Sequence, residues 1–166
     1  YALEPPSQPS LFEQVDLGTK IHSTIGDIRY QEKLASVIEA FEPEFVFHLA
    51  AQPLVLRGYD DPLYTFDVNV MGSGHLLQIL RETPSTRVCL ITTTDKCYDN
   101  KEWVWGYRET DPIGGQDPYS ASKGAAELVI RSHVKSFFPI KTSNIRIASA
   151  RAGNVIGGGD WSKNRL

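Results

Sequence analysis

The chain has 166 residues, of which 41% are hydrophobic and 22% are charged, and its formal net charge is −3. This length and composition suit one domain with a hydrophobic core and exclude two full-sized domains. The mild negative charge and the lack of a basic run argue against a nucleic-acid partner or an anionic membrane surface, which need clustered Lys and Arg. No apolar stretch is long enough to span a membrane and the first residues do not resemble a signal peptide, so a cytoplasmic protein is expected.

The first predicted elements are a loop, a short strand and a helix. Residues 4–10 are rich in proline and predict the loop, and a strand is expected within residues 17–25, around Lys20. Asp27 follows the predicted strand end, where a carboxylate could bind a ligand or cap a turn, and the residues alone favour neither. The helix is predicted from Tyr30 to Phe41, because the apolar residues of that segment fall on one helical stripe.

A second strand and a second helix follow. Phe45 to Leu49 is a continuous run of strand-forming apolar residues, which predicts a strand buried on both faces. His48 within it is interpreted as a core histidine with a satisfied hydrogen bond, in preference to a catalytic group. One long helix is predicted from Asp61 to Thr83. A polar side chain such as Asn69 within that helix is usually solvated.

The predicted strand from Val88 to Thr92 delivers polar residues at its carboxyl end. It leads into Thr94-Asp95-Lys96. Because open α/β sheets bind ligands at the carboxyl ends of their strands, the chemistry is expected near this triplet. The aromatic loop of residues 99–109 is long enough to be functional. It could cover a ligand or contact another domain, and the sequence leaves both alternatives open.

A tyrosine and a lysine four residues apart open the next predicted helix, Tyr119 to Phe137. On a helix Tyr119 and Lys123 are neighbours on one face, about 6 Å apart along the axis. An adjacent ammonium favours the phenolate, which makes the phenol a usable base near neutral pH. This spacing alone is more often a surface pair. A last strand is predicted from Asn144 to Ala150, followed by a glycine-rich run.

Strands and helices therefore alternate, which predicts an α/β protein with a doubly wound, Rossmann-like parallel sheet. A Gly-x-Gly-x-x-Gly turn normally cradles the pyrophosphate of a dinucleotide, and the start of this chain has none. We therefore expect residues 1–166 to be a partial dinucleotide-binding domain without its first β-α-β unit and its C-terminal substrate domain, with residues 151–166 beginning the connection. The cysteines and histidines show no metal-ligand spacing, so no metal is expected.

Three motifs together resemble one known family. The Tyr119 and Lys123 pair resembles the Tyr-x-x-x-Lys element of short-chain dehydrogenases/reductases, and Thr94-Asp95-Lys96 is similar to the sugar-nucleotide 4,6-dehydratases of its extended branch. The last motif resembles a run of the CDP-glucose 4,6-dehydratases in that branch. It reads Arg151-Ala152-Gly153-Asn154-Val155-Ile156-Gly157-Gly158-Gly159-Asp160-Trp161. The resemblance covers essentially the whole chain.

The resemblance implies a cytoplasmic, NAD-dependent lyase that converts CDP-glucose or a related sugar nucleotide into a 4-keto-6-deoxy product, for deoxysugars such as those of lipopolysaccharide O-antigen. The sugar would be oxidised at C4, lose water across C5 and C6, and be reduced at C6. Tyr119 would take the C4 hydroxyl proton, Thr94 would hydrogen-bond that oxygen, and Lys123 would hold the phenolate and the nicotinamide ribose. Asp95 would be the acid for the departing C6 oxygen, and Lys96 the base at C5.

Lys96 departs from most sugar-nucleotide 4,6-dehydratases, which carry Glu at this position. An amine accepts a proton only when it is neutral. Desolvation and the positive charges of Lys123 and of oxidised nicotinamide would favour the neutral form.

The resemblance also implies contacts to NAD. Asp27 and Ile28 would bracket the adenine, small side chains after the second strand would admit the pyrophosphate and ribose, and Asn69 would hydrogen-bond the strand end that carries Thr94. The implied NAD contacts are Asp27, Ile28, Leu49, Ala50, Ala51, Gln52, Asn69, Tyr119 and Lys123, and the implied substrate contacts are Thr94 and Asn154. A homodimer or higher homo-oligomer is implied through the helices that begin near Asp61 and Tyr119.

The same motifs leave two alternative functions to consider. A sugar-nucleotide 4-epimerase keeps Tyr119 and Lys123 but needs no acid and base at C5 and C6, so Thr94-Asp95-Lys96 argues against it. A non-catalytic dinucleotide-binding protein would tend to lose the tyrosine or the lysine, and both are present.

Overall fold

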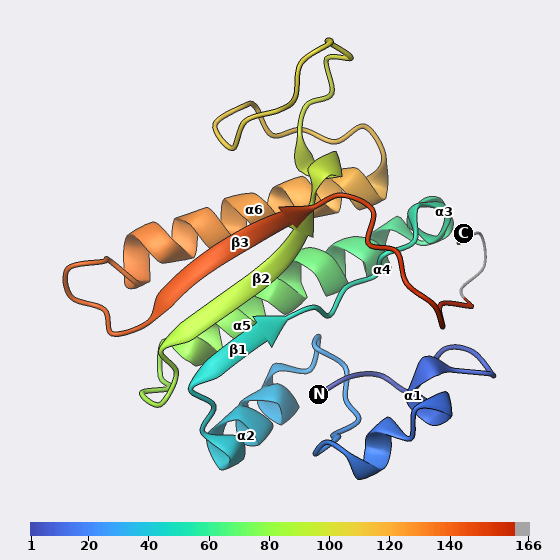
Figure 1. Cartoon of the computed structure of the whole chain (residues 1–166). Coiled ribbons are helices and arrows are strands. Elements are labelled where there is room, and N and C mark those ends of the chain that lie inside the picture. The colour runs from blue at the N-terminus through green and yellow to red at the C-terminus, as the bar shows by residue number, and fades with distance from the viewer. Residues whose placement is uncertain (162–166) are drawn as a thin grey trace.

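The computed structural model describes residues 1–161 and contains one three-stranded parallel sheet (Figure 1). Its strands are β1 (Phe45–His48), β2 (Val88–Thr94) and β3 (Arg146–Ala152), in the order β1-β2-β3. The predicted parallel α/β sheet is therefore confirmed. The last strand begins two residues later than predicted and runs on to Ala152. Of the predicted connection to a substrate domain, residues 162–166 lie outside the described part of the chain.

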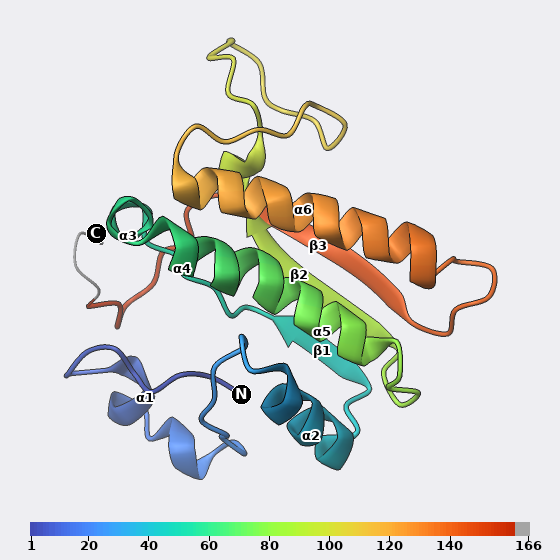
Figure 2. The same cartoon turned by 180° about the vertical axis from the view of Figure 1, so that it is seen from behind.

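Six α-helices are described together with short turns of other helical types. The helices are α1 (Leu11–Gln14), α2 (Gln31–Phe41), α3 (Val55–Asp60), α4 (Pro62–Phe66), α5 (Gly72–Leu80) and α6 (Pro118–Phe137). Helices α5 and α6 lie side by side on one face of the sheet (Figure 2). This follows from right-handed crossovers that run in one direction from β1 to β2 to β3. The core fills the space between that face and the helices, and its fully buried centre includes Leu77, Cys89 and Ile91.

The segment predicted as one long helix consists of α4, a π turn and α5, and the chain is helical throughout residues 62–80. Asp61 caps it, because its side chain accepts a hydrogen bond from the Tyr64 backbone N at 3.1 Å. The π turn covers Asp67–Met71 between α4 and α5. A π turn holds one more residue than an α turn. As a result the adjacent residues Val68 and Asn69 are both buried.

The strand predicted within residues 17–25 is wrong. Leu17–Thr19 forms a 3₁₀ turn, which follows Asp16 in the left-handed region with φ 51°. Within residues 1–161, this segment pairs only through an isolated bridge between Ala2 and Ile25, with hydrogen bonds from Ala2 N to Thr24 O at 3.1 Å and from Gly26 N to Ala2 O at 2.8 Å. The segment around Lys20 forms no strand, because no neighbouring strand in the described residues extends that bridge into a ladder.

Strand β1 is confirmed, but its predicted burial on both faces is wrong. Val46 and His48 face the helices, whereas Phe45 and Phe47 are 56% and 64% exposed on the opposite face. The strand is at the edge of the sheet, and no helix of residues 1–161 covers its outer face. The run is apolar throughout, so its pattern could not distinguish a covered face from an open one.

Candidate active site

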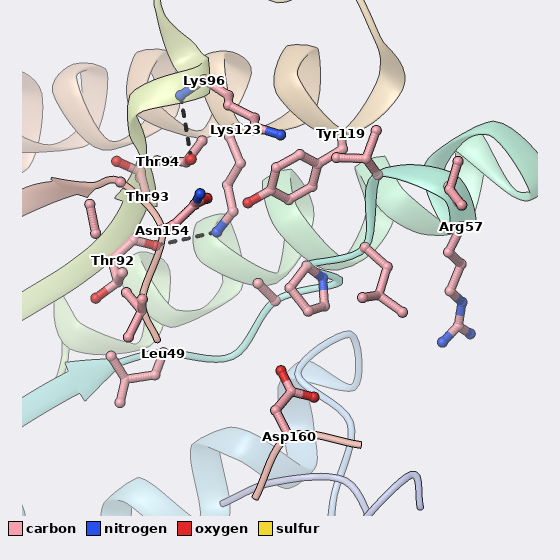
Figure 3. A pocket seen from close by; sticks show the side chains of 18 of the residues that line it. Leu49, Arg57, Thr92, Thr93, Thr94, Lys96, Tyr119, Lys123, Asn154 and Asp160 are labelled. Carbon is pink, nitrogen blue, oxygen red and sulfur yellow. Dashed lines mark hydrogen bonds between the residues drawn. The ribbon is translucent and has the colours of Figure 1, made fainter. Parts of the chain in front are cut away.

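A cavity of about 1000 Å³ opens at the carboxyl edge of the sheet (Figure 3). This is the place where parallel sheets bind ligands, and the volume lies at the upper end of the ~300–1000 Å³ range of cofactor and small-molecule sites. Its walls come from α3, α6 and the segments that follow β1, β2 and β3. The predicted residues that line it are Leu49, Ala51, Thr94, Lys96, Tyr119, Lys123 and Asn154.

Helix α6 brings its tyrosine and lysine to the cavity. Asp117 caps the helix by accepting a hydrogen bond from Ser120 N at 3.0 Å, and Pro118 occupies the first position. Tyr119 and Lys123 are 9% and 7% exposed and point into the same part of the cavity (Figure 3). The Lys123 ammonium also donates to the Thr92 carbonyl at 3.3 Å, which fixes α6 to the end of β2.

Burial lowers the pKa of Lys123 to about 8, and the negative charge of Glu127 opposes part of this shift. Unfolded lysines titrate near ~10.4, so between about pH 8 and that value the unfolded chain binds more protons than the folded protein. This group therefore makes the protein more stable as pH rises through that window.

We accordingly expect the melting temperature of the wild type to rise relative to that of Lys123→Met between about pH 7 and pH 10. Thermal unfolding across that range measures the difference. The exposed Lys135 on the same helix provides a matched control, Lys135→Met, whose curve should stay parallel to that of the wild type. A Lys123→Met curve that also stays parallel would contradict the expected gain.

The polar triplet after β2 is held by local hydrogen bonds. The Thr94 hydroxyl donates to the Asp95 carboxylate at 3.1 Å and accepts from the Lys96 backbone N at 3.4 Å. The Lys96 ammonium lies on the Tyr119 side of the cavity (Figure 3). Asp95 is not among the lining residues, and the Lys96 side chain is exposed, where the sequence argument expected desolvation. The residues before Ser162 therefore do not exclude water from Lys96.

His48 is a core histidine, as the sequence indicated. Its Nε2 lies 3.1 Å from the Ser73 hydroxyl, which itself donates to the Asn69 carbonyl at 2.7 Å. The single hydroxyl proton is thus used, so Nε2 carries the proton and donates to Ser73. Burial, assisted by the positive charge of Lys123, lowers the pKa of His48 to about 4. The side chain is neutral at physiological pH.

Asn69 is buried, and its hydrogen bonds differ from those predicted. Its Oδ1 accepts from Gln52 N at 2.8 Å, and its Nδ2 donates to Gln52 O at 3.1 Å and to the Ser122 hydroxyl at 2.8 Å. It therefore clamps the segment after β1 onto α6 and does not bond the strand end that carries Thr94. The π turn explains this, because it turns Asn69 toward the interior beside Gln52. Neither residue lines the cavity, nor does Ala50.

Asp27 and Ile28 lie outside the cavity walls. The Asp27 carboxylate forms an ion pair with Arg29 at 2.7 Å, and the hydrogen bonds from Arg29 hold the pKa of Asp27 below its usual range. Ile28 belongs to the core and packs against Gly72, where an added Cβ would overlap the Ile28 side chain. The carboxylate is thus engaged by a residue two positions away.

The aromatic loop forms a cluster of its own. Tyr98 and Tyr107 stack with ring centroids 5.0 Å apart, and Trp103 lies 5.3 Å from Tyr107 and 5.5 Å from Trp105. None of these rings lines the cavity, and Trp105 is 64% exposed. The loop projects from the body of the domain (Figure 1). The described contacts support neither alternative that the sequence left open.

A buried polar network adjoins the cavity, and sequence reasoning missed it. Glu127, only 5% exposed, accepts hydrogen bonds from the hydroxyls of Thr93 and of Ser149, the latter at 3.1 Å, and pairs with Arg151 at 3.0 Å. Burial acts to raise the pKa of Glu127, but the Arg151 and Thr93 hydrogen bonds outweigh it and the pKa falls. The available signal was the position of Glu127 four residues after Lys123, on the same helix face.

Metal-binding clusters and membrane-spanning helices are absent from residues 1–161. No cluster of three or more His, Cys, Asp or Glu side chains is placed to hold a metal ion there. Cys89 and Cys97 are both buried as free thiols. Within the same residues, no helix combines the length and apolarity needed to cross a membrane.

Comparison with known proteins shows which family this sequence matches. The family described as GDP-mannose 4,6 dehydratase matches residues 9–152. A CDP-glucose 4,6-dehydratase from Salmonella typhimurium is 54% identical over 169 aligned positions, which cover 100% of this chain and 47% of that protein. The chain thus spans about half the length of this curated relative.

Solved structures agree with the fold. A dTDP-glucose 4,6-dehydratase from Streptomyces venezuelae with NAD bound matches with a TM-score of 0.69 at 25% identity, over 82% of this chain and 40% of that one. A UDP-glucose 4-epimerase from Thermus thermophilus in complex with NAD matches with a TM-score of 0.67, also at 25% identity, over 80% of this chain and 42% of that one.

Proposed function

This chain belongs to the family described as GDP-mannose 4,6 dehydratase, and from that membership we propose that the protein is an NAD-dependent 4,6-dehydratase whose substrate is CDP-glucose. The observation that carries the proposal is the joint presence of Thr94, Lys96, Tyr119 and Lys123 around one cavity at the carboxyl edge of a parallel sheet. The 54% identity to a CDP-glucose 4,6-dehydratase supports the choice of nucleotide.

The cavity walls fit the nicotinamide-ribose end of NAD. Leu49 and Ala51 offer apolar and small side chains, and the buried Lys123 ammonium can donate to ribose hydroxyls beside Tyr119. When bound, NAD would supply the hydride acceptor for C4 and the hydride donor for C6. Ala50, Gln52 and Asn69 would position the backbone after β1 against the cofactor. Asp27 and Ile28 lie outside this cavity, and we propose that they contact the adenine end, where the Asp27 carboxylate would accept a further hydrogen bond while paired with Arg29.

Proton removal at C4 is assigned to the phenol of Tyr119. Its phenolate would accept the C4 hydroxyl proton while the Thr94 hydroxyl hydrogen-bonds the same oxygen. Lys123 lies one helical turn away, and its positive charge favours the phenolate. Asn154, on the segment that follows β3, also lines the cavity and would contact the sugar.

Water elimination is assigned to the residues that follow β2. A C4 ketone acidifies the C5 proton, so elimination becomes feasible only after oxidation. Lys96 would take the C5 proton, for which its exposed amine must first lose its own proton. The C5 electron pair would then form the C5–C6 double bond, and the C6–O bond would break. Asp95 would give a proton to the departing oxygen, so that water leaves. Asp95 must turn toward the cavity for this step, because its carboxylate is now bonded to Thr94.

The proposal also covers the cellular location and the oligomeric state of the protein. We propose a cytoplasmic enzyme that supplies deoxysugar synthesis, such as that of O-antigen. We also propose a homodimer or higher homo-oligomer that uses α4, the π turn and α6. These elements carry exposed apolar side chains at Leu63, Met71 and Leu128, which a second copy would cover.

The test is to incubate the whole protein with NAD and CDP-glucose and to follow formation of the 4-ketosugar by its absorbance in alkali. UDP-glucose and dTDP-glucose serve as competitors for specificity. A ketosugar that keeps its C6 hydroxyl, or an epimerised sugar without loss of water, would overturn the dehydratase assignment.

A further inference from the structure

The buried carboxylate of Glu127 joins three separate parts of the chain. It lies on α6 and accepts hydrogen bonds from Thr93 at the end of β2 and from Ser149 in β3. Arg151, near the end of β3, completes the set with its ion pair. One side chain thus ties the helix to both strands at the edge where the cavity opens.

Arg151 extends the network to the aromatic loop. Its Nη1 donates to the Glu109 carbonyl at 3.0 Å, and its guanidinium lies 4.9 Å from the centroid of the Tyr98 ring. The residue before the loop, Tyr98, and its last residue, Glu109, therefore both contact this one side chain. The loop base is closed by hydrogen bonds from Asp99 N to Pro112 O at 2.9 Å and from Gly114 N to Cys97 O at 2.8 Å.

The loop base also rests directly on α6. At Gly124 an added Cβ would overlap the Gly114 carbonyl and the Ile113 side chain. Gly124 directly follows Lys123, so the helix turn that presents the buried ammonium to the cavity also supports the loop. The absence of a side chain at Gly124 permits this close approach.

Three members of this network lie at the cavity wall or close to it in sequence. Thr93 lines the cavity itself, Arg151 directly precedes Ala152, which also lines it, and Glu127 is one helical turn after Lys123. The network therefore sets the distance between groups carried by α6 and groups carried by the strand ends. Misplacement of reacting groups by about 1 Å can cost on the order of 100-fold in rate.

We propose that Glu127 and Arg151 are positioning residues, which hold the ends of β2 and β3 and the base of the aromatic loop against α6 so that Thr94 and Lys96 face Tyr119 and Lys123. The kinetic part of this inference rests on the proposed function. The structural part does not, because it concerns contacts among residues of this chain alone.

The test uses three variants of the whole protein. Glu127→Gln keeps the size of the side chain and removes its charge, and Ser149→Ala removes one neutral donor in case the first variant does not fold. The matched control is Thr86→Val, which removes a buried hydrogen bond from the Thr86 hydroxyl to the Pro43 carbonyl, of 2.8 Å, at the opposite edge of the sheet. Melting temperatures, kcat and KM for CDP-glucose, and amide hydrogen exchange of residues 98–114 are measured for each.

For Glu127→Gln we expect kcat per folded protein to fall at least about tenfold while KM changes less than about twofold, because geometry is lost and binding groups are kept. The amides of Asp99 and Gly114 should exchange about tenfold faster. Ser149→Ala should show both effects at about threefold. Thr86→Val should lower only the melting temperature.

Unchanged kcat or unchanged exchange in folded Glu127→Gln would overturn the positioning role. Equal losses of kcat in Thr86→Val would do the same, since they would reveal a general effect of lower stability. If the wild type does not turn over CDP-glucose, the proposed function fails, and the exchange of residues 98–114 still decides whether Glu127 anchors the loop.

Discussion

Replacing Tyr119 with phenylalanine in the whole protein is expected to slow oxidation of CDP-glucose at C4 by at least about 100-fold, because general-base catalysis contributes about 10²- to 10⁴-fold. The aromatic ring stays, so the Kd for CDP-glucose should change by less than about twofold. The near-ultraviolet absorbance of reduced nicotinamide, followed in a single turnover, measures the oxidation rate, and calorimetric titration measures the Kd.

Tyr107→Phe is the matched control for this change. The Tyr107 hydroxyl donates to Asn100 Oδ1 at 2.8 Å and accepts from Lys101 N at 2.7 Å, within the aromatic loop and outside the cavity. Tyr107→Phe removes the same hydroxyl oxygen from another tyrosine and should leave the oxidation rate within about twofold of the wild-type rate. Oxidation at the wild-type rate in Tyr119→Phe would remove Tyr119 from the proposed mechanism.

Replacing Lys96 with methionine should separate oxidation from elimination. Tyr119 and Lys123 remain on α6, so oxidation at C4 should proceed within about threefold of the wild-type rate. The base at C5 is gone, so loss of water should slow by at least about 100-fold. Reduced nicotinamide should therefore accumulate on the protein while little 4-keto-6-deoxy product forms, and both are measured in one quenched time course.

Lys96→Arg distinguishes a base from a fixed charge. A guanidinium keeps the positive charge but does not deprotonate in proteins, so it cannot accept the C5 proton. Elimination should stall in this variant as well. If Lys96→Arg forms product at the wild-type rate, Lys96 acts through its charge alone. Product formation at that rate by Lys96→Met would assign the base to another residue.

The elements that the sequence predicted well are those fixed by short-range patterns. Helix α6 has a capping Asp117 and a following Pro118, and α2 has a single apolar stripe. The apolar run of β2 ends in hydroxyl side chains. Because parallel strands present their carboxyl ends at one edge, these local features were sufficient to place Thr94, Tyr119 and Lys123 near one another.

The features that the sequence did not predict depend on partners distant along the chain. Glu127 and Arg151 are 24 positions apart, and the packing of α6 against β2 and β3 brings them together. The exposed face of β1 depends on which elements cover the sheet. The partner of Asp27 was not predicted either, although Arg29 is only two positions away. A carboxylate near a turn can form several kinds of hydrogen bond, and the sequence does not show which one it forms.

The π turn between α4 and α5 has a consequence for insertions and deletions. Each residue of a regular α-helix turns the chain by about 100°, so removing one residue within α5 would rotate Leu76, Leu77 and Leu80 away from the core. Removing Asn69 would instead convert the wide turn into a regular one and leave the helix on each side in phase. The Asn69 clamp on Gln52 and Ser122 thus depends on the one extra residue of the π turn, and deleting that residue should remove the clamp while the leucines of α5 keep their places in the core.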